Sequence, residues 1–176
     1  MKHFFKLTIL ASVVTALIFG LSAFTSAKKA TNTASYQLTL LEKSVIGTNQ
    51  TWTWSLVNPN PGNGDNETLQ DVSHLSFPLN ALAEAALVSA EYSYDGVNWT
   101  TNPISMDRDP AIKQCTSVDV LKFDIGTTGT APLYYRITLN EQFETNAWAT
   151  CYIKTGGGRN GCNMYYFAGV AGQKLD

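Results

Sequence analysis

The stretch LYYRITL, residues 133–139, indicates the fold class, because apolar and polar positions alternate along it. One set of positions is Leu133, Tyr135, Ile137 and Leu139, and the other is Tyr134, Arg136 and Thr138. Successive side chains of a β-strand leave opposite faces of the sheet, so the alternation predicts a strand with one buried face. The stretch WTWSL, residues 52–56, repeats the pattern and places two tryptophans on one face.

Further segments carry the same signal. Alternation is clear at 36–40 and 88–94, and less regular at 72–77, 118–124, 149–154 and 163–168. In the segment 88–94 we expect one face to hold Val88, Ala90, Tyr92 and Tyr94. Turn-forming residues separate the segments, at 58–65, 95–96, 126–129 and 156–161. One short helix is expected near 80–87, where Asn80 can cap it. About eight short strands predict an all-β fold, a single antiparallel β-sandwich of immunoglobulin-like or jelly-roll-like type.

The first 27 residues have the layout of a secretory signal peptide. Lys2 and Lys6 precede an apolar run over 7–24, and the small residue Ala27 ends the segment. The alternative is an uncleaved membrane anchor, because the run is nearly long enough to span a bilayer. We expect cleavage after Ala27 and a secreted or cell-surface protein, with membrane contact only through this segment before cleavage.

The rest of the chain has the size of one domain. We expect a flexible N-terminus at 28–34, a sandwich domain at 35–170 and a tail at 171–176. The whole sequence has a net charge of −2, and loss of the two lysines before residue 27 makes the remainder more acidic. A mildly acidic chain without basic runs disfavours nucleic acid as a partner.

Three cysteines suggest one disulfide and one free thiol in an oxidising compartment. Cys151 and Cys162 flank a predicted hairpin turn, and their offsets do not place them opposite each other. We therefore favour a bond between Cys115 and Cys162, with Cys115–Cys151 as the alternative.

The tryptophans and a glycine-rich turn suggest where a ligand could bind. Trp52 and Trp54 are expected to fill the core, whereas Trp148 is the better candidate for an exposed ring that stacks on a sugar. Arg159 and Asn160 lie in the turn at 156–161, which could hold an anion, although a long hairpin turn explains it as well. We expect a glycan or protein partner to meet Trp148, Arg159, Asn160 and the loops 58–71 and 155–161.

The loop after residue 58 offers oxygen ligands for calcium. Asn60, Asn63, Asp65 and Glu67 are close in sequence, but only two of them are carboxylates and the spacing of a calcium-binding loop is absent. Calcium is therefore a weak candidate, and no other cofactor is expected.

No residue stands out as catalytic. His74 is the single histidine after residue 27 and is expected to be structural; Ser73 beside it would face the other side of a strand. Carboxylates for glycoside hydrolysis would have to sit about 5 to 9 Å apart, and no spacing selects two. We expect a non-catalytic binding or adhesion module. The alternatives are a secreted carbohydrate-active hydrolase with paired carboxylates in a cleft beside Trp99 or Trp148, and a self-associating surface component.

Several short motifs occur in a fixed order along the chain. They are WTW at 52–54, NPNPGNG at 58–64, LQDVSH at 69–74, the DG hairpin at 95–99 and LKFDIG at 121–126. This order resembles a group of uncharacterised exported bacterial proteins rich in β-structure. The resemblance implies export and a β-sandwich, and it implies neither a substrate nor catalytic residues.

Overall fold

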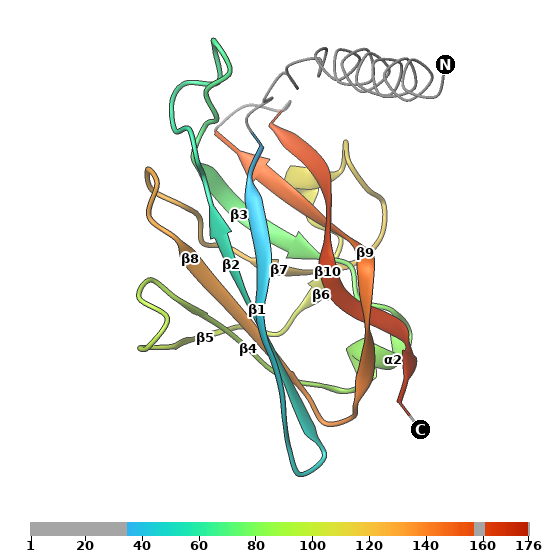
Figure 1. Cartoon of the computed structure of the whole chain (residues 1–176). Helices are drawn as coiled ribbons and strands as arrows, with labels where there is room; N and C mark the ends of the chain where they lie inside the picture. Colours follow the sequence, from blue (N-terminus) through green and yellow to red (C-terminus); the bar gives the residue numbers. More distant parts are fainter. Residues whose placement is uncertain (1–34, 157–160, 176) are drawn as a thin grey trace, which may run out of the picture. The chain divides into compact units, whose positions relative to one another are not determined.

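The computed structural model describes residues 35–156 and 161–175, which form two antiparallel five-stranded sheets (Figure 1). The first sheet has the order β1-β2-β8-β4-β5 and the second β10-β9-β3-β7-β6. The elements are β1 (Gln37–Ile46), β2 (Asn49–Val57), β3 (Val72–Phe77), α2 (Ala81–Ala85), β4 (Leu87–Ser93), β5 (Thr100–Asn102), β6 (Met106–Asp107), the 3-10 helix η1 (Pro110–Ile112), β7 (Val120–Phe123), β8 (Leu133–Leu139), β9 (Phe143–Thr155) and β10 (Cys162–Lys174). The predicted all-β sandwich is confirmed.

The alternation in 133–139 produces the central strand of the first sheet. Every second residue of β8 is buried, from Leu133 to Leu139. Strand β2 pairs with β8 so that Trp54 lies opposite Tyr135, and both side chains point into the core. One-sided burial on neighbouring strands makes the inner layer of the first sheet.

The two tryptophans of β2 lie at the centre of the core, as expected. Trp52 and Trp54 are 0% and 1% exposed, and their rings stack at 6.0 Å with an interplanar angle of 13°. Trp54 also meets Phe77 and Phe167 of the second sheet, at 5.3 and 5.8 Å between ring centroids. Its Nε1 donates to the backbone oxygen of Ala168 at 2.7 Å, so the polar edge of the buried indole is satisfied.

Strand β4 departs from the predicted alternation. Val88 and Tyr94, expected on the buried face, are 50% and 65% exposed. The register against β8 shifts between Leu87 and Ser89, which is a bulge that turns Val88 outward. Tyr94 lies beyond the end of the strand, at the start of the turn. The sequence also missed β5 and β6, because two or three residues are too short to show a period.

The predicted short helix is confirmed as α2, and Asn80 caps it. The Asn80 side chain accepts hydrogen bonds from the backbone N–H groups of Leu82 and Ala83. Across 35–156 and 161–175, no helix has both the length and the apolar character needed to cross a membrane. Strand β10 continues to Lys174, so most of the stretch expected as a tail at 171–176 is part of the sheet.

A disulfide fastens the segment between β6 and β7 to the second sheet. Cys115 is bonded to Cys162, which confirms the favoured pair, and the alternative pair does not form. Cys151 is instead a free buried thiol, and its burial raises its pKa to about 12. Ile112 and Tyr152 complete a second small core beneath the segment.

The Asp95-Gly96 hairpin is a structural turn. Gly96 has φ +73°, which favours glycine, and a Cβ added at this position would lie 3.4 Å from the ring of Tyr134. Asp95 Oδ1 accepts from the backbone N–H groups of Asn98 and Val97 at 2.7 and 2.8 Å. These bonds hold the pKa of the Asp95 carboxyl well below its usual range.

Candidate functional site

Trp148 is exposed on the outer face of the second sheet. It lies on β9 and keeps 75% of its surface exposed, whereas its neighbour Ala149 packs against the main core. Its backbone N–H donates to Asn146 Oδ1 at 2.9 Å, which orders the chain before the ring. The predicted exposure of Trp148 is confirmed, and its role in binding stays a prediction. Arg159 and Asn160 lie outside the described residues.

Trp148 is accompanied by residues that the sequence analysis did not single out. Tyr166 of β10 is 60% exposed, and its ring centroid lies 6.2 Å from that of Trp148 at an interplanar angle of 77°. Met164, two residues earlier on the same face, is 48% exposed. We call Trp148, Tyr166 and Met164 the aromatic platform. Alternation in 163–168 could have revealed it, because inward-facing Tyr165 and Phe167 leave Tyr166 outside.

A separate hollow lies where the two predicted ligand loops meet. Its volume is about 430 Å³. The residues that line it come from both loops and from the neighbouring strands: Tyr36, Asn63, Gly64, Thr68, Leu69, Gln70, Thr155, Gly161, Asn163 and Tyr165. The structure therefore brings residues of the two loops together, and the binding of a partner there stays a prediction.

Several polar groups that line this hollow form hydrogen bonds with one another. Tyr36 Oη donates to the backbone oxygen of Gln70, and Gln70 Nε2 donates to the backbone oxygen of Asn63 at 2.9 Å. Burial, with smaller contributions from Tyr165 and Asp71, raises the pKa of Tyr36 to about 12, so the hydroxyl stays a donor. Internal bonding of this kind favours a structural role for the hollow over ligand capture.

The residues proposed to bind calcium lie in the same loop, and the side-chain amides of Asn60 and Asn63 donate hydrogen bonds within it. Asn63 Nδ2 donates to Asp65 Oδ2 at 2.8 Å, and Asn60 Nδ2 donates to the backbone oxygen of Glu67 at 3.0 Å. Where the structure describes the chain, no three His, Cys, Asp or Glu side chains are grouped to hold a metal ion. The geometry thus adds no support for calcium.

Four ionisable side chains meet on the outer face of the second sheet. His74 Nε2 lies 3.0 Å from Asp109 Oδ2, without the alignment of a hydrogen bond. Lys122 Nζ lies 3.7 Å from the same oxygen and 3.3 Å from Asp124 Oδ1. Both His74 and Asp109 are nearly inaccessible, with 6% of each side chain exposed. This cluster joins β3 and β7 to the start of the segment between β6 and β7, residues 108–119, which we call the covering segment.

We predict that stability falls as pH decreases below about 6.5. Burial of the imidazole lowers the pKa of His74 most, and the positive charge of Lys122 lowers it further. The carboxylates of Asp109 and Asp124 raise this pKa, but by less. A positively charged Lys154 adds to the lowering. The unfolded chain therefore binds a proton on His74 more readily than the folded chain, so acid favours unfolding until the folded-state pKa is passed.

Urea unfolding between pH 7.5 and 5 measures this effect. His74→Gln is expected to flatten the dependence over that window, because no side chain at position 74 can then titrate. A dependence equally steep in His74→Gln would assign the effect to carboxylates.

A further hollow of about 300 Å³ bears on the hydrolase alternative. Asp107, Asp109 and Asp124 are among the residues that line it, together with Lys122. Neither Trp99 nor Trp148 is among the described residues lining it. Trp99 instead stacks under Arg136, with the guanidinium 3.9 Å from the ring centroid. The condition that a hydrolase would require, acids and a tryptophan in one cleft, is not met here.

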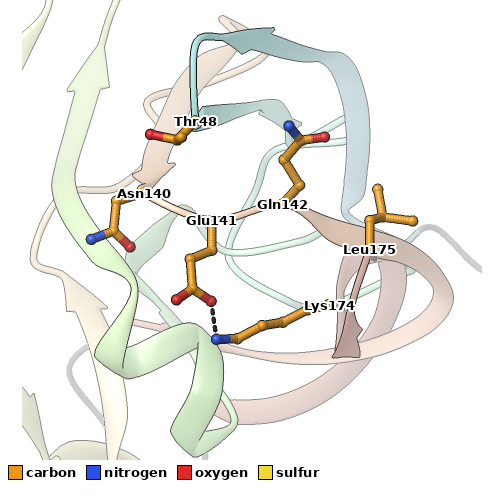
Figure 2. Close-up of a pocket in the computed structure, with 6 residues that line it drawn as sticks. All are labelled: Thr48, Asn140, Glu141, Gln142, Lys174 and Leu175. Atoms are coloured by element: carbon orange, nitrogen blue, oxygen red, sulfur yellow. Dashed lines mark ion pairs between the residues drawn. The ribbon is translucent and has the colours of Figure 1, made fainter.

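The hollow in Figure 2 lies between two hairpin turns and the end of β10. It measures about 420 Å³ and is lined by Thr48, Asn140, Glu141, Gln142, Lys174 and Leu175. Glu141 and Lys174 point toward each other and form an ion pair (Figure 2). Because the acid and the base neutralise each other, and because no aromatic ring lines the hollow, it presents no distinctive chemistry.

Comparison with protein-family models, with the sequences of curated proteins and with solved structures found no match. The candidate site is therefore argued from its own geometry. The aromatic platform differs from the three hollows in two respects. Its side chains are exposed and lie on two paired strands, and they are not engaged in hydrogen bonds or ion pairs with other described residues.

Proposed function

We propose that the protein is an exported, non-catalytic binding module that holds a glycan against the aromatic platform. The observation that carries the proposal is the 75% exposure of Trp148 beside Tyr166 on two paired strands. An indole presents a large apolar face that gains free energy when a partner covers it, and the strands already hold it in place. The CH groups on one face of a sugar ring form such a partner.

Two observations support export. Residues 1–27 have the layout of a signal peptide. The bond between Cys115 and Cys162 is of a kind that persists in oxidising compartments outside the cytosol.

Trp148→Ala is expected to weaken glycan binding by about tenfold or more, because it removes the stacking surface and leaves the fold in place. A glycan array read with the purified protein identifies the ligand, and affinity electrophoresis in that glycan measures the loss. Tyr94→Ala is the matched control, because Tyr94 is 65% exposed and also makes an edge contact with a neighbouring ring, that of Tyr92.

Equal losses in the two variants would contradict the assignment to Trp148. Release of reducing sugar from the bound glycan, measured over hours, would contradict the non-catalytic part of the proposal and favour the hydrolase alternative.

Self-association through strand edges is less favoured. The two long edge strands, β1 and β10, lie side by side (Figure 1), and Tyr36 meets Tyr165 across them at 5.7 Å. The opposite edges, β5 and β6, contain three and two residues, too few to recruit another strand. A stable oligomer in analytical ultracentrifugation would instead favour a self-associating surface component.

A further inference from the structure

We infer that the aromatic platform binds a single ring of a neutral, soluble glycan chain, and neither a crystalline polysaccharide surface nor an acidic glycan. The inference rests on the proposed function and specifies its ligand. It follows from the angle between two rings, from the charge of the strands around them and from the polar groups beside them.

The first argument is geometric. A flat crystalline surface touches several rings only where those rings share one plane. The rings of Trp148 and Tyr166 stand at 77° to each other with centroids 6.2 Å apart, so one plane cannot cover both faces. The pair forms a corner, in which a sugar ring that stacks on Trp148 meets Tyr166 at its side.

The second argument is electrostatic. From 143 to 153 along β9 the single charged residue is Glu144, and from 163 to 172 along β10 there is none. A uronate or sulfate group would find no lysine or arginine on these stretches, and the chain as a whole has a net charge of −2. A partner of negative charge is therefore repelled weakly, whereas a neutral one is not.

The third argument concerns hydrogen bonding. Asn146, two residues before Trp148, uses Oδ1 to accept from the backbone N–H of Trp148, and its Nδ2 can donate to a ligand. Thr150 lies opposite Tyr166 in the pairing of β9 with β10 and carries a hydroxyl on that face. Uncharged donors and acceptors around an apolar ring match a ligand that has hydroxyl groups and an apolar face.

The test is a binding titration measured by isothermal titration calorimetry, which measures binding equally well in variants that keep or lose Trp148. In the natural protein, tryptophan emission gives a second signal dominated by Trp148, because Trp52 and Trp54 are buried and Trp99 is covered by Arg136. The probes are soluble neutral hexasaccharides of glucose, xylose and mannose, an oligogalacturonate as the acidic probe, and a pull-down on microcrystalline cellulose.

We expect saturable binding of at least one neutral hexasaccharide. Its affinity should change less than about twofold between 50 and 500 mM salt, because no charge pair contributes. Trp148→Ala should lose about tenfold or more and Tyr166→Ala about threefold, while Tyr94→Ala should bind like the natural protein. Trp148→Phe, which keeps an aromatic face, should recover part of the affinity, and circular dichroism of each variant checks its fold.

Two results overturn the inference while the proposed function stands. One is Trp148-dependent binding to oligogalacturonate that weakens with salt, and the other is Trp148-dependent retention on crystalline cellulose. If no probe binds and the glycan array is also empty, the proposed function fails and the inference fails with it.

Discussion

Trp54→Ala is expected to lower the free energy of unfolding by about 3–5 kcal/mol, the cost of removing a large aromatic side chain from a packed core. The indole is 1% exposed and bridges the two sheets, because it extends from β2 to Phe77 and Phe167. Its removal also leaves the carbonyl of Ala168 without its donor. Urea unfolding followed by circular dichroism measures the loss without relying on tryptophan emission.

The matched control is Ser55→Ala on the other face of the same strand. Ser55 is half-buried and is expected to change stability by less than about 0.5 kcal/mol. Trp54→Phe should fall between the two, because a ring remains between the sheets. A Trp54→Ala protein as stable as Ser55→Ala would show that this indole does not hold the sheets together.

Alternation predicted the central strands because burial on one face imposes a period of two on the sequence. The pairing of β2 with β8 has no register shift, so the period continues along both strands. The alternation therefore correctly predicted which of their apolar side chains are buried, including Trp54 and Tyr135. At Val88 a bulge shifts the period by one residue. No glycine or proline in this strand indicates the bulge in the sequence. The shortest strands, β5 and β6, exist only through their pairing with β4 and β7.

The candidate site was partly predictable for the same reason. Trp148 could be recognised from its polar surroundings, and Tyr166 from its place between two inward-facing residues. Asp109 was not foreseen as the partner of His74, because it belongs to a loop 35 positions away in the sequence. Contacts of this kind depend on how the covering segment folds back, and the periodicity of a strand does not encode them.

Replacing Cys115 and Cys162 together by serine is expected to lower the free energy of unfolding by about 4 kcal/mol. The bond closes a loop with a sequence separation of 47 residues, and in the chain-entropy treatment a loop of that length restricts the unfolded chain by about this amount. Urea unfolding under non-reducing conditions measures the difference. A dithiol reductant added to the natural protein should produce a loss of similar size.

Cys151→Ala is the control, because Cys151 is buried like Cys162 but forms no disulfide. It should cost about 1 kcal/mol and should not respond to the reductant. The double serine variant should also lose hydrogen-exchange protection at the backbone N–H groups of Ile112 and Cys115, which bond within the covering segment. Strands β2 and β8 should keep their protection in native conditions, because their pairing does not involve that segment. A double variant as stable as Cys151→Ala, with the segment still protected, would show that the second small core holds the segment without the disulfide.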